Sequence, residues 1–271
     1  MIALTATPHA RLRDLLAAEW IKLWSLRSTA WLLGVGTLVM IGLAAQKSID
    51  TYNSWPAFPP REKAMHNPMT DALSGLTAAF LVMGAGSVGA LTIAGEYASG
   101  LIRTTFAAVP ARHRVVAAKV CVVAGVMLAT GTVIAVATFG VSQAILSGRD
   151  AGVSIGDPGV LRALTANALL APVSALAGMG IGALLRHTAA TIVTVIAVLV
   201  VLPTAFKPTV HQWANELYAL FPFYVWRNCL SLTHPRVDPA LPTVTGSWIV
   251  FALWPLAGAL LTLIVLRRRD V

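Results

Sequence analysis

The chain has 271 residues, of which 57% are hydrophobic and only 11% charged, and its formal net charge is +9. A soluble domain carries about 25% charged residues because its surface faces water, so this composition, with a mean hydropathy of +0.75, excludes an ordinary soluble fold. A nucleic-acid-binding domain is excluded as well. Its basic residues would gather on one soluble face, whereas here they lie in short segments between apolar runs.

The first predicted element is an amphipathic helix over residues 10–27. Leucine and tryptophan side chains recur in it at helical spacing and form one apolar stripe, made of Leu12, Leu15, Leu16, Trp20, Leu23 and Trp24. Such a helix lies in the inner headgroup plane, with its tryptophan rings as anchors and its basic residues near anionic lipid. The alternative is that these residues are only the cytosolic start of the first span.

Six membrane spans follow from the apolar runs. A helix rises about 1.5 Å per residue, so about 20 mostly apolar residues cross about 30 Å of hydrocarbon. The predicted spans are residues 29–45, 72–94, 118–143, 161–185, 188–206 and 247–266. The charged stretch before the first run is longer than the start of a signal peptide, so we expect that run to be retained. The fold class is therefore all-α and polytopic, with a single transmembrane domain over residues 1–271.

The segment before the last span, residues 207–246, is predicted to form a re-entrant or interfacial helical hairpin on the outer side. It is rich in aromatic residues, which favour the headgroup level, and Pro222 and Arg227 interrupt it. Pro222 and Trp226 are its candidate site residues. The alternative is that residues 217–232 cross the membrane, which would give seven spans and an outer C-terminus.

The basic residues predict the orientation. With six spans, most of the lysines and arginines fall in segments on the side of the two termini, and the positive-inside rule places that side in the cytosol. We therefore expect a multi-pass protein of the bacterial cytoplasmic membrane with both termini cytosolic.

The loop after the second span, residues 96–114, carries the functional prediction. Gly100 allows a sharp bend. A short helix would follow, with Leu101, Ile102, Thr105 and Phe106 as its apolar face, and Pro110 would end it before a basic segment. A short helix of this kind suits docking in the groove of a partner. The alternative is an ordinary basic loop on the cytosolic side.

This loop resembles the corresponding loop in the permease subunits of type-2 ABC exporters. The residues that stand in the same order and at the same spacing as the family's loop are Glu96, Gly100, Leu101, Ile102, Phe106, Pro110, Arg112 and Lys119. The segment AEWIKLWSLRST before the first span is also similar to actinobacterial members of that group. Leu101 stands where the family has Thr, and Tyr97 replaces a common charged residue, which leaves the identity of the partner open.

The resemblance implies a permease dimer, formed with a second copy or a paralogue, on two cytosolic ABC ATPase subunits that bind ATP and Mg. The loop would be the coupling helix that the ATPase subunits push. By position, the resemblance assigns contact or hinge roles to Glu96, Gly100, Leu101, Ile102, Arg103, Thr105, Phe106, Pro110 and Arg112. It implies efflux of a hydrophobic or amphipathic substrate by alternating access, as in multidrug or antibiotic resistance. The cargo would be a natural product, a peptide or a lipid.

The chain itself is predicted to be neither an enzyme nor a cofactor carrier, because no G-x-x-x-x-G-K-[ST] phosphate loop occurs. The histidines and the two cysteines, Cys121 and Cys229, show no metal-ligand spacing or disulfide framework. Two alternatives stay open, a secondary-active carrier and a non-transporting sensor or assembly protein. A carrier normally needs ionisable groups buried in its spans, whereas Glu96 and Lys119 map near span ends.

Small residues predict close helix packing. Ser174, Gly178 and Gly182 recur every four residues and would let two helices approach, either within one subunit or at the dimer seam or translocation path. Asn167 and Gln143 are amides in span-like segments. Each could make a buried interhelical bond, which we favour, or contact substrate.

Overall fold

The computed structural model describes residues 11–25, 27–109, 111–205, 212–235 and 241–268. Regular structure in these ranges is helical, and none of them contains a strand. The helices are α1 (Leu12–Ser25), α2 (Arg27–Ser54), α3 (Pro60–Met65), α4 (Met69–Ala72), α5 (Gly75–Ala98), α6 (Leu101–Ala108), α7 (Arg112–Leu146), α8 (Val160–Leu185), α9 (Thr188–Ile196), α10 (Leu202–Ala205), α11 (Gln212–Tyr218), α12 (Pro222–Val225) and α13 (Val244–Arg268).

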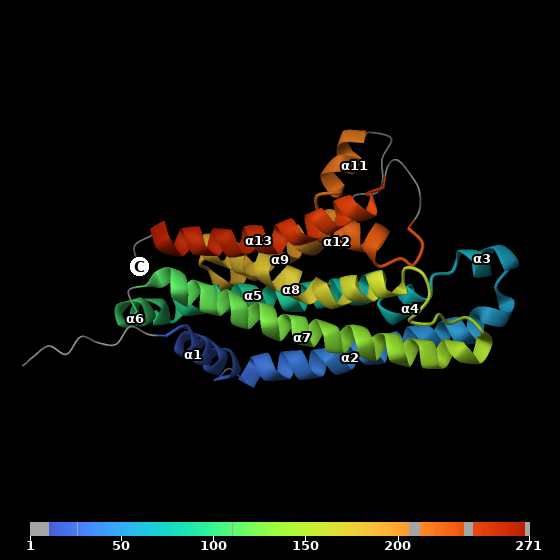
Figure 1. The fold of residues 1–271 in the computed structure, drawn as a ribbon, viewed down its shortest axis with the longest axis horizontal. Coiled ribbons are helices and arrows are strands. Elements are labelled where there is room, and N and C mark those ends of the chain that lie inside the picture. Colours follow the sequence, from blue (N-terminus) through green and yellow to red (C-terminus); the bar gives the residue numbers. More distant parts are fainter. Residues whose placement is uncertain (1–10, 26, 110, 206–211, 236–240, 269–271) are drawn as a thin grey trace, which may run out of the picture.

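The long helices run side by side along the longest axis of the molecule, and α8 packs against α5, α7 and α13 (Figure 1). Helices α1 and α6 lie at one end of this bundle, which we call the α6 end. Helix α3 lies at the opposite end, the α3 end (Figure 1). The bundle therefore has two ends with different short helices and one long apolar middle.

Five helical segments of the described chain are long and apolar enough to cross a membrane. They are Arg27–Ala57, Gly75–Ala98, Arg112–Arg149, Val160–Leu185 and Val244–Arg267. Large apolar side chains also point outward from the bundle, such as Trp31 on α2 and Leu256 on α13, which are 70% and 59% exposed. A surface of this kind suits hydrocarbon rather than water. The predicted all-α, membrane-embedded class is confirmed.

The predicted fifth span, residues 188–206, is a broken helix. Helix α9 passes through a π-helical turn, Ala197–Val201, into α10. The wide turn precedes Pro203, whose ring would clash with the Leu199 carbonyl in a regular α-helix. The apolar stretch Thr188–Thr204 falls short of span length, and residue 206 lies outside the described chain. Six spans therefore stay a prediction.

Several helices are longer than their apolar runs, or begin later. Helix α2 continues nine residues beyond the predicted end at residue 45, to Ser54, because a helix does not need apolar residues to continue and no Pro or Gly interrupts these. Helix α7 likewise exceeds the predicted 118–143 at both ends. Helix α5 begins at Gly75 rather than at residue 72, because Ser74 accepts a hydrogen bond from the Thr77 amide and caps it.

The segment before α13 folds back onto the bundle. Pro222 opens α12, and Trp226 opens a π-helical turn, Trp226–Leu230; both residues are buried. The Trp226 indole Nε1 donates a hydrogen bond of 2.9 Å to Asn167 Oδ1 of α8. Within residues 212–235 no helix reaches span length, which favours the hairpin over a seventh span. The rest of the predicted segment, residues 207–211 and 236–240, lies outside the described chain.

Helices α5 and α8 touch backbone to backbone. A Cβ added at Gly178 would clash with the carbonyl oxygen of Gly86, and one added at Gly182 would lie 2.6 Å from that of Ala90. Ser174, 2% exposed, donates a hydrogen bond to the Leu170 carbonyl. The small residues of α8 thus lie at a contact inside the subunit. Asn167 makes the buried bond that we favoured, to Trp226. Gln143 instead makes a part-buried bond, in which its Oε1 accepts from the Val153 amide in the loop after its own helix.

A buried polar cluster holds the connection between α2 and α5 at the α3 end. The Asp71 carboxylate of α4, 1% exposed, accepts a hydrogen bond of 2.7 Å from Thr51 Oγ1 of α2. Its other oxygen lies 2.8 Å from His66 Nε2. Asp71 thereby fixes the connection between α2 and α5 to the first long helix.

Candidate functional site

The turn from α5 into α6 depends on Gly100. This residue has φ 71, in the left-handed region that glycine adopts at no steric cost. Its conformation turns the chain out of α5, so that α6 lies across the α6 end of the bundle (Figure 1). Arg112 then begins α7. Pro110, predicted to end this short helix, lies outside the described residues.

The apolar face of α6 points into its own bundle. Ile102 and Phe106, four residues apart, are 2% and 8% exposed, and the Arg112 guanidinium lies 5.2 Å from the centroid of the Phe106 ring. The resemblance assigns contact or hinge roles to Ile102 and Phe106. In this structure both side chains belong to the main apolar core of the bundle, so they are not open to a partner, and a hinge role stays a prediction. The surface open to a partner carries Leu101 and Arg103, which are exposed.

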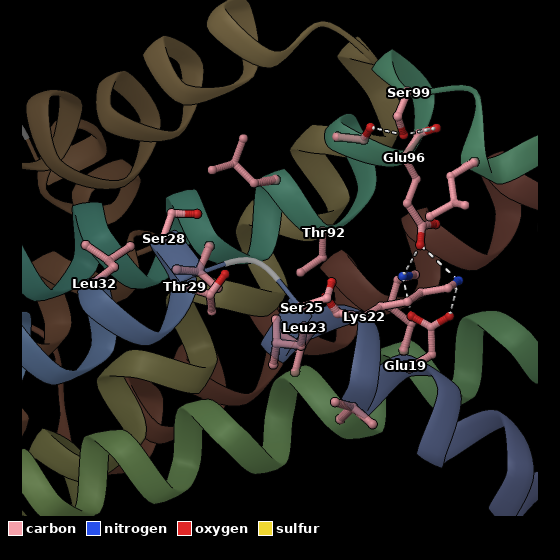
Figure 2. A pocket seen from close by; sticks show the side chains of 17 residues that line it. Glu19, Lys22, Leu23, Ser25, Ser28, Thr29, Leu32, Thr92, Glu96 and Ser99 are labelled. Carbon is pink, nitrogen blue, oxygen red and sulfur yellow. Dashed lines mark hydrogen bonds and ion pairs between the residues drawn. The ribbon is translucent and has the colours of Figure 1, made fainter.

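Four charged residues lie together at the α6 end, and we call them the charged cluster: Glu19, Lys22, Glu96 and Lys119 (Figure 2). The Glu96 carboxylate accepts hydrogen bonds of 2.9 Å from Lys119 Nζ and 3.1 Å from Lys22 Nζ. Glu19 pairs with the same two lysines, at 2.7 Å from Lys22 and in direct contact with Lys119. The ion pairs close into a ring in which each acid contacts both lysines.

The charged cluster joins four helices. Glu19 and Lys22 come from α1, Glu96 from α5 and Lys119 from α7, while Lys22 Nζ also donates to Thr105 Oγ1 of α6 at 3.3 Å. Glu19, Glu96 and Lys119 are at most 9% exposed. Burying a charge costs several kcal/mol, about 3–5 if one partner of a pair is removed, so a closed ring is the arrangement that keeps such charges stable.

The environment of Lys22 keeps it charged. Burial acts to lower its pKa, but hydrogen bonding to Glu19 and the charges of Glu96 and Glu19 outweigh burial and raise the pKa above its ordinary 10.5. A group with a raised pKa in the folded state stabilises that state below its unfolded-state pKa, and this contribution is lost only as the pH rises through the folded value. Lys22 therefore holds α1 in place across the whole neutral range.

Sequence reasoning missed the α1 half of the charged cluster. The face of α1 that packs on the bundle is Leu15, Glu19 and Leu23, all buried, whereas Trp20 and Trp24 of the predicted apolar stripe are 50% and 40% exposed. The four-residue spacing that places Glu19 between two buried leucines was the available signal. The signal was missed because a single acidic residue such as Glu19 is normally interpreted as exposed to solvent, and the sequence does not show the lysine that pairs with it.

An arginine outside the charged cluster lies at the turn between α8 and α9. Arg186 has φ 55 and places its guanidinium 4.7 Å from the centroid of the Tyr97 ring of α5, a cation–π distance. Tyr97 replaces a charged residue that is common in exporter permeases, and here its ring packs against Arg186 from the turn between α8 and α9. The described residues contain no group of three His, Cys, Asp or Glu side chains that could hold a metal ion.

A cavity of about 380 Å³ extends from the charged cluster between α1, α2, α5 and α7 (Figure 2). All four charged residues line one part of it, and apolar side chains with a few hydroxyl groups line the remainder.

Comparison with known protein families found no match, and comparison with curated proteins found no similar sequence. The likeness to exporter permeases therefore rests on the sequence resemblance itself: the residues of the loop and of the N-terminal segment, together with the order of the predicted spans and the outer segment before the last span.

Proposed function

We propose that this chain is the membrane-spanning permease subunit of an ATP-driven ABC exporter. In this proposal α6 is the coupling helix that a separate ATPase subunit pushes. The supporting observation is that one lysine, Lys22, bonds to α6 through Thr105 and to the end of α5 through Glu96. A push on α6 would therefore reach α1, α5 and α7 together.

The charged cluster suits this mechanical role. Moving one helix relative to another would break the ion pairs between them, and breaking a buried ion pair costs free energy. Because Glu96 contacts lysines of both α1 and α7, the three helix ends would move as one body. The exposed Leu101 and Arg103 of α6 would form the contact with the ATPase subunit.

The proposal includes an orientation and an assembly. The α6 end would face the cytosol at a bacterial cytoplasmic membrane, and two permease chains, identical or paralogous, would bind two ATPase subunits. Export of a hydrophobic or amphipathic substrate would follow from alternating access. The apolar interior of the bundle supports that substrate class.

Co-purification tests the proposal. From native membranes in mild detergent, the chain should bring down a nucleotide-binding protein in equal amount. The double variant Leu101→Asp with Arg103→Glu should reduce that recovery by about tenfold or more. It makes the exposed surface of α6 acidic and leaves the buried Ile102 and Phe106 unchanged.

Arg61→Glu is the matched control, since Arg61 is an exposed arginine on α3 at the opposite end. It should leave recovery unchanged. If wild-type protein brings down no nucleotide-binding protein, or if both variants lose it equally, the proposal is wrong.

A secondary-active carrier is the second candidate. The charged cluster favours a carrier, because buried acids paired with lysines are groups at which a proton or another ion could bind and so couple transport to an ion gradient. Reconstituted alone, such a carrier would transport its substrate until the ion gradient was collapsed, whereas the proposed exporter subunit would be inactive without its ATPase.

A further inference from the structure

The cavity beside the charged cluster is charged at one end and uncharged at the other. Glu96 and Lys22 lie at the first end, Thr92 lies between, and Leu32 of α2 lies at the far end with Ser28 and Thr29 beside it (Figure 2). Along α5 the lining runs from Ser99, at the helix terminus, to Val88, about three turns further toward the middle of the bundle.

The cavity is also accessible from the side of the bundle. Leu32 on α2 and Leu91 on α5 both line it and are 45% and 37% exposed. Both helices are long and apolar enough to span a membrane, so an opening between them faces hydrocarbon. With α2 and α5 spanning a bilayer, the uncharged end would lie toward its centre and the charged end toward the headgroups.

We infer that this cavity binds one membrane phospholipid, with an acyl chain between α2 and α5 and its headgroup beside the charged cluster. Three observations support an acyl chain over a bulkier ligand: the charged end gives way to a mostly apolar lining, as in a bilayer leaflet, the lateral opening lets the rest of the lipid stay in the bilayer, and 380 Å³ is near the small end of ligand cavities, which run from about 300 to 1,000 Å³. The inference does not depend on coupling to an ATPase.

The charges at the headgroup end predict little headgroup selectivity. Two acids and two lysines pair with one another, so no net charge is left to attract an anionic lipid. Polar contacts are left to hydroxyl groups on the lining, such as those of Ser25 and Ser99. The site should therefore take a zwitterionic lipid about as well as an anionic one.

Native mass spectrometry after delipidation in detergent tests the inference. The wild-type chain should retain one phospholipid, and Leu91→Trp, which fills the opening, should reduce the retained fraction by about tenfold. Leu256→Trp is the matched control, because Leu256 is an exposed leucine on α13 outside the cavity lining. It should retain lipid like the wild type. After reconstitution in equal amounts of phosphatidylethanolamine and phosphatidylglycerol, the two lipids should be retained within about threefold of one another.

Equal retention in both tryptophan variants, or no retained lipid in the wild type, would overturn the inference. So would a retained molecule that is not a phospholipid, such as a transported amphiphile. Thr92→Phe narrows the same cavity from the middle of its α5 wall and serves if Leu91→Trp does not fold.

Discussion

Lys119 shows at the scale of single residues how the bundle holds a charge. It is 4% exposed, it lies on a helix long enough to span the membrane, and its ammonium group contacts both Glu19 and Glu96. Since each acid also contacts Lys22, the four residues form one unit. Their contributions to stability should therefore be non-additive.

Lys119→Met tests this unit. It should lower the free energy of unfolding in mixed micelles by about 3 kcal/mol, because two buried acids are left with one lysine. Adding Glu96→Gln should recover part of that loss, since it removes one unpaired charge. Lys47→Met changes an exposed lysine and should stay within about 0.5 kcal/mol of wild type. If the double variant is less stable than Lys119→Met, the ring of pairs is wrong.

At the scale of elements, the packing of α5 on α8 has no room for a side chain at Gly178. Backbone atoms of Gly86 occupy the space where its Cβ would lie. Backbone cannot move aside as a flexible side chain can, so any substitution must separate the two helices.

Gly178→Ala should destabilise the protein by about 1–3 kcal/mol. Gly140→Ala, within α7 and with open space around its Cβ, should be neutral or stabilise by up to about 1 kcal/mol, since alanine is the better helix former. Thermal unfolding of the two variants in the same detergent gives the comparison. Equal effects would mean that helix propensity, and not contact, governs both sites.

The helices could be predicted from the sequence to different degrees. Long apolar runs give α5, α8 and α13 almost directly, because hydrocarbon allows few other structures. The end of α2 could not be predicted from hydropathy, since its last turns are polar. Contacts between helices determine that Phe106 is buried and that Glu19 pairs with Lys119. The residue pattern of one helix does not show which helices pack against it.

At the scale of the whole molecule, the proposed function depends on which side of the membrane the α6 end occupies. The two ends carry comparable exposed arginines, Arg103 on α6 and Arg61 on α3. A cysteine placed at each of these two exposed positions can therefore report which end of the bundle faces the outside of the cell.

In a background with Cys121→Ala and Cys229→Ala, a membrane-impermeant maleimide added to intact cells should label Arg61→Cys and leave Arg103→Cys unlabelled. Arg103→Cys should react only after the membrane is opened. Labelling of Arg103→Cys in intact cells would place α6 outside and beyond the reach of any cytosolic ATPase.

The pairing of Glu19 with Lys119 also has a consequence for biosynthesis. The partners are 100 residues apart, which at about 5–20 residues per second is a delay of several seconds during translation. Until α7 emerges from the ribosome, Glu19 has only Lys22 of its own helix as a partner. We therefore expect the buried ring of ion pairs, and with it the final docking of the N-terminal helix, to form only once the third long helix is in place.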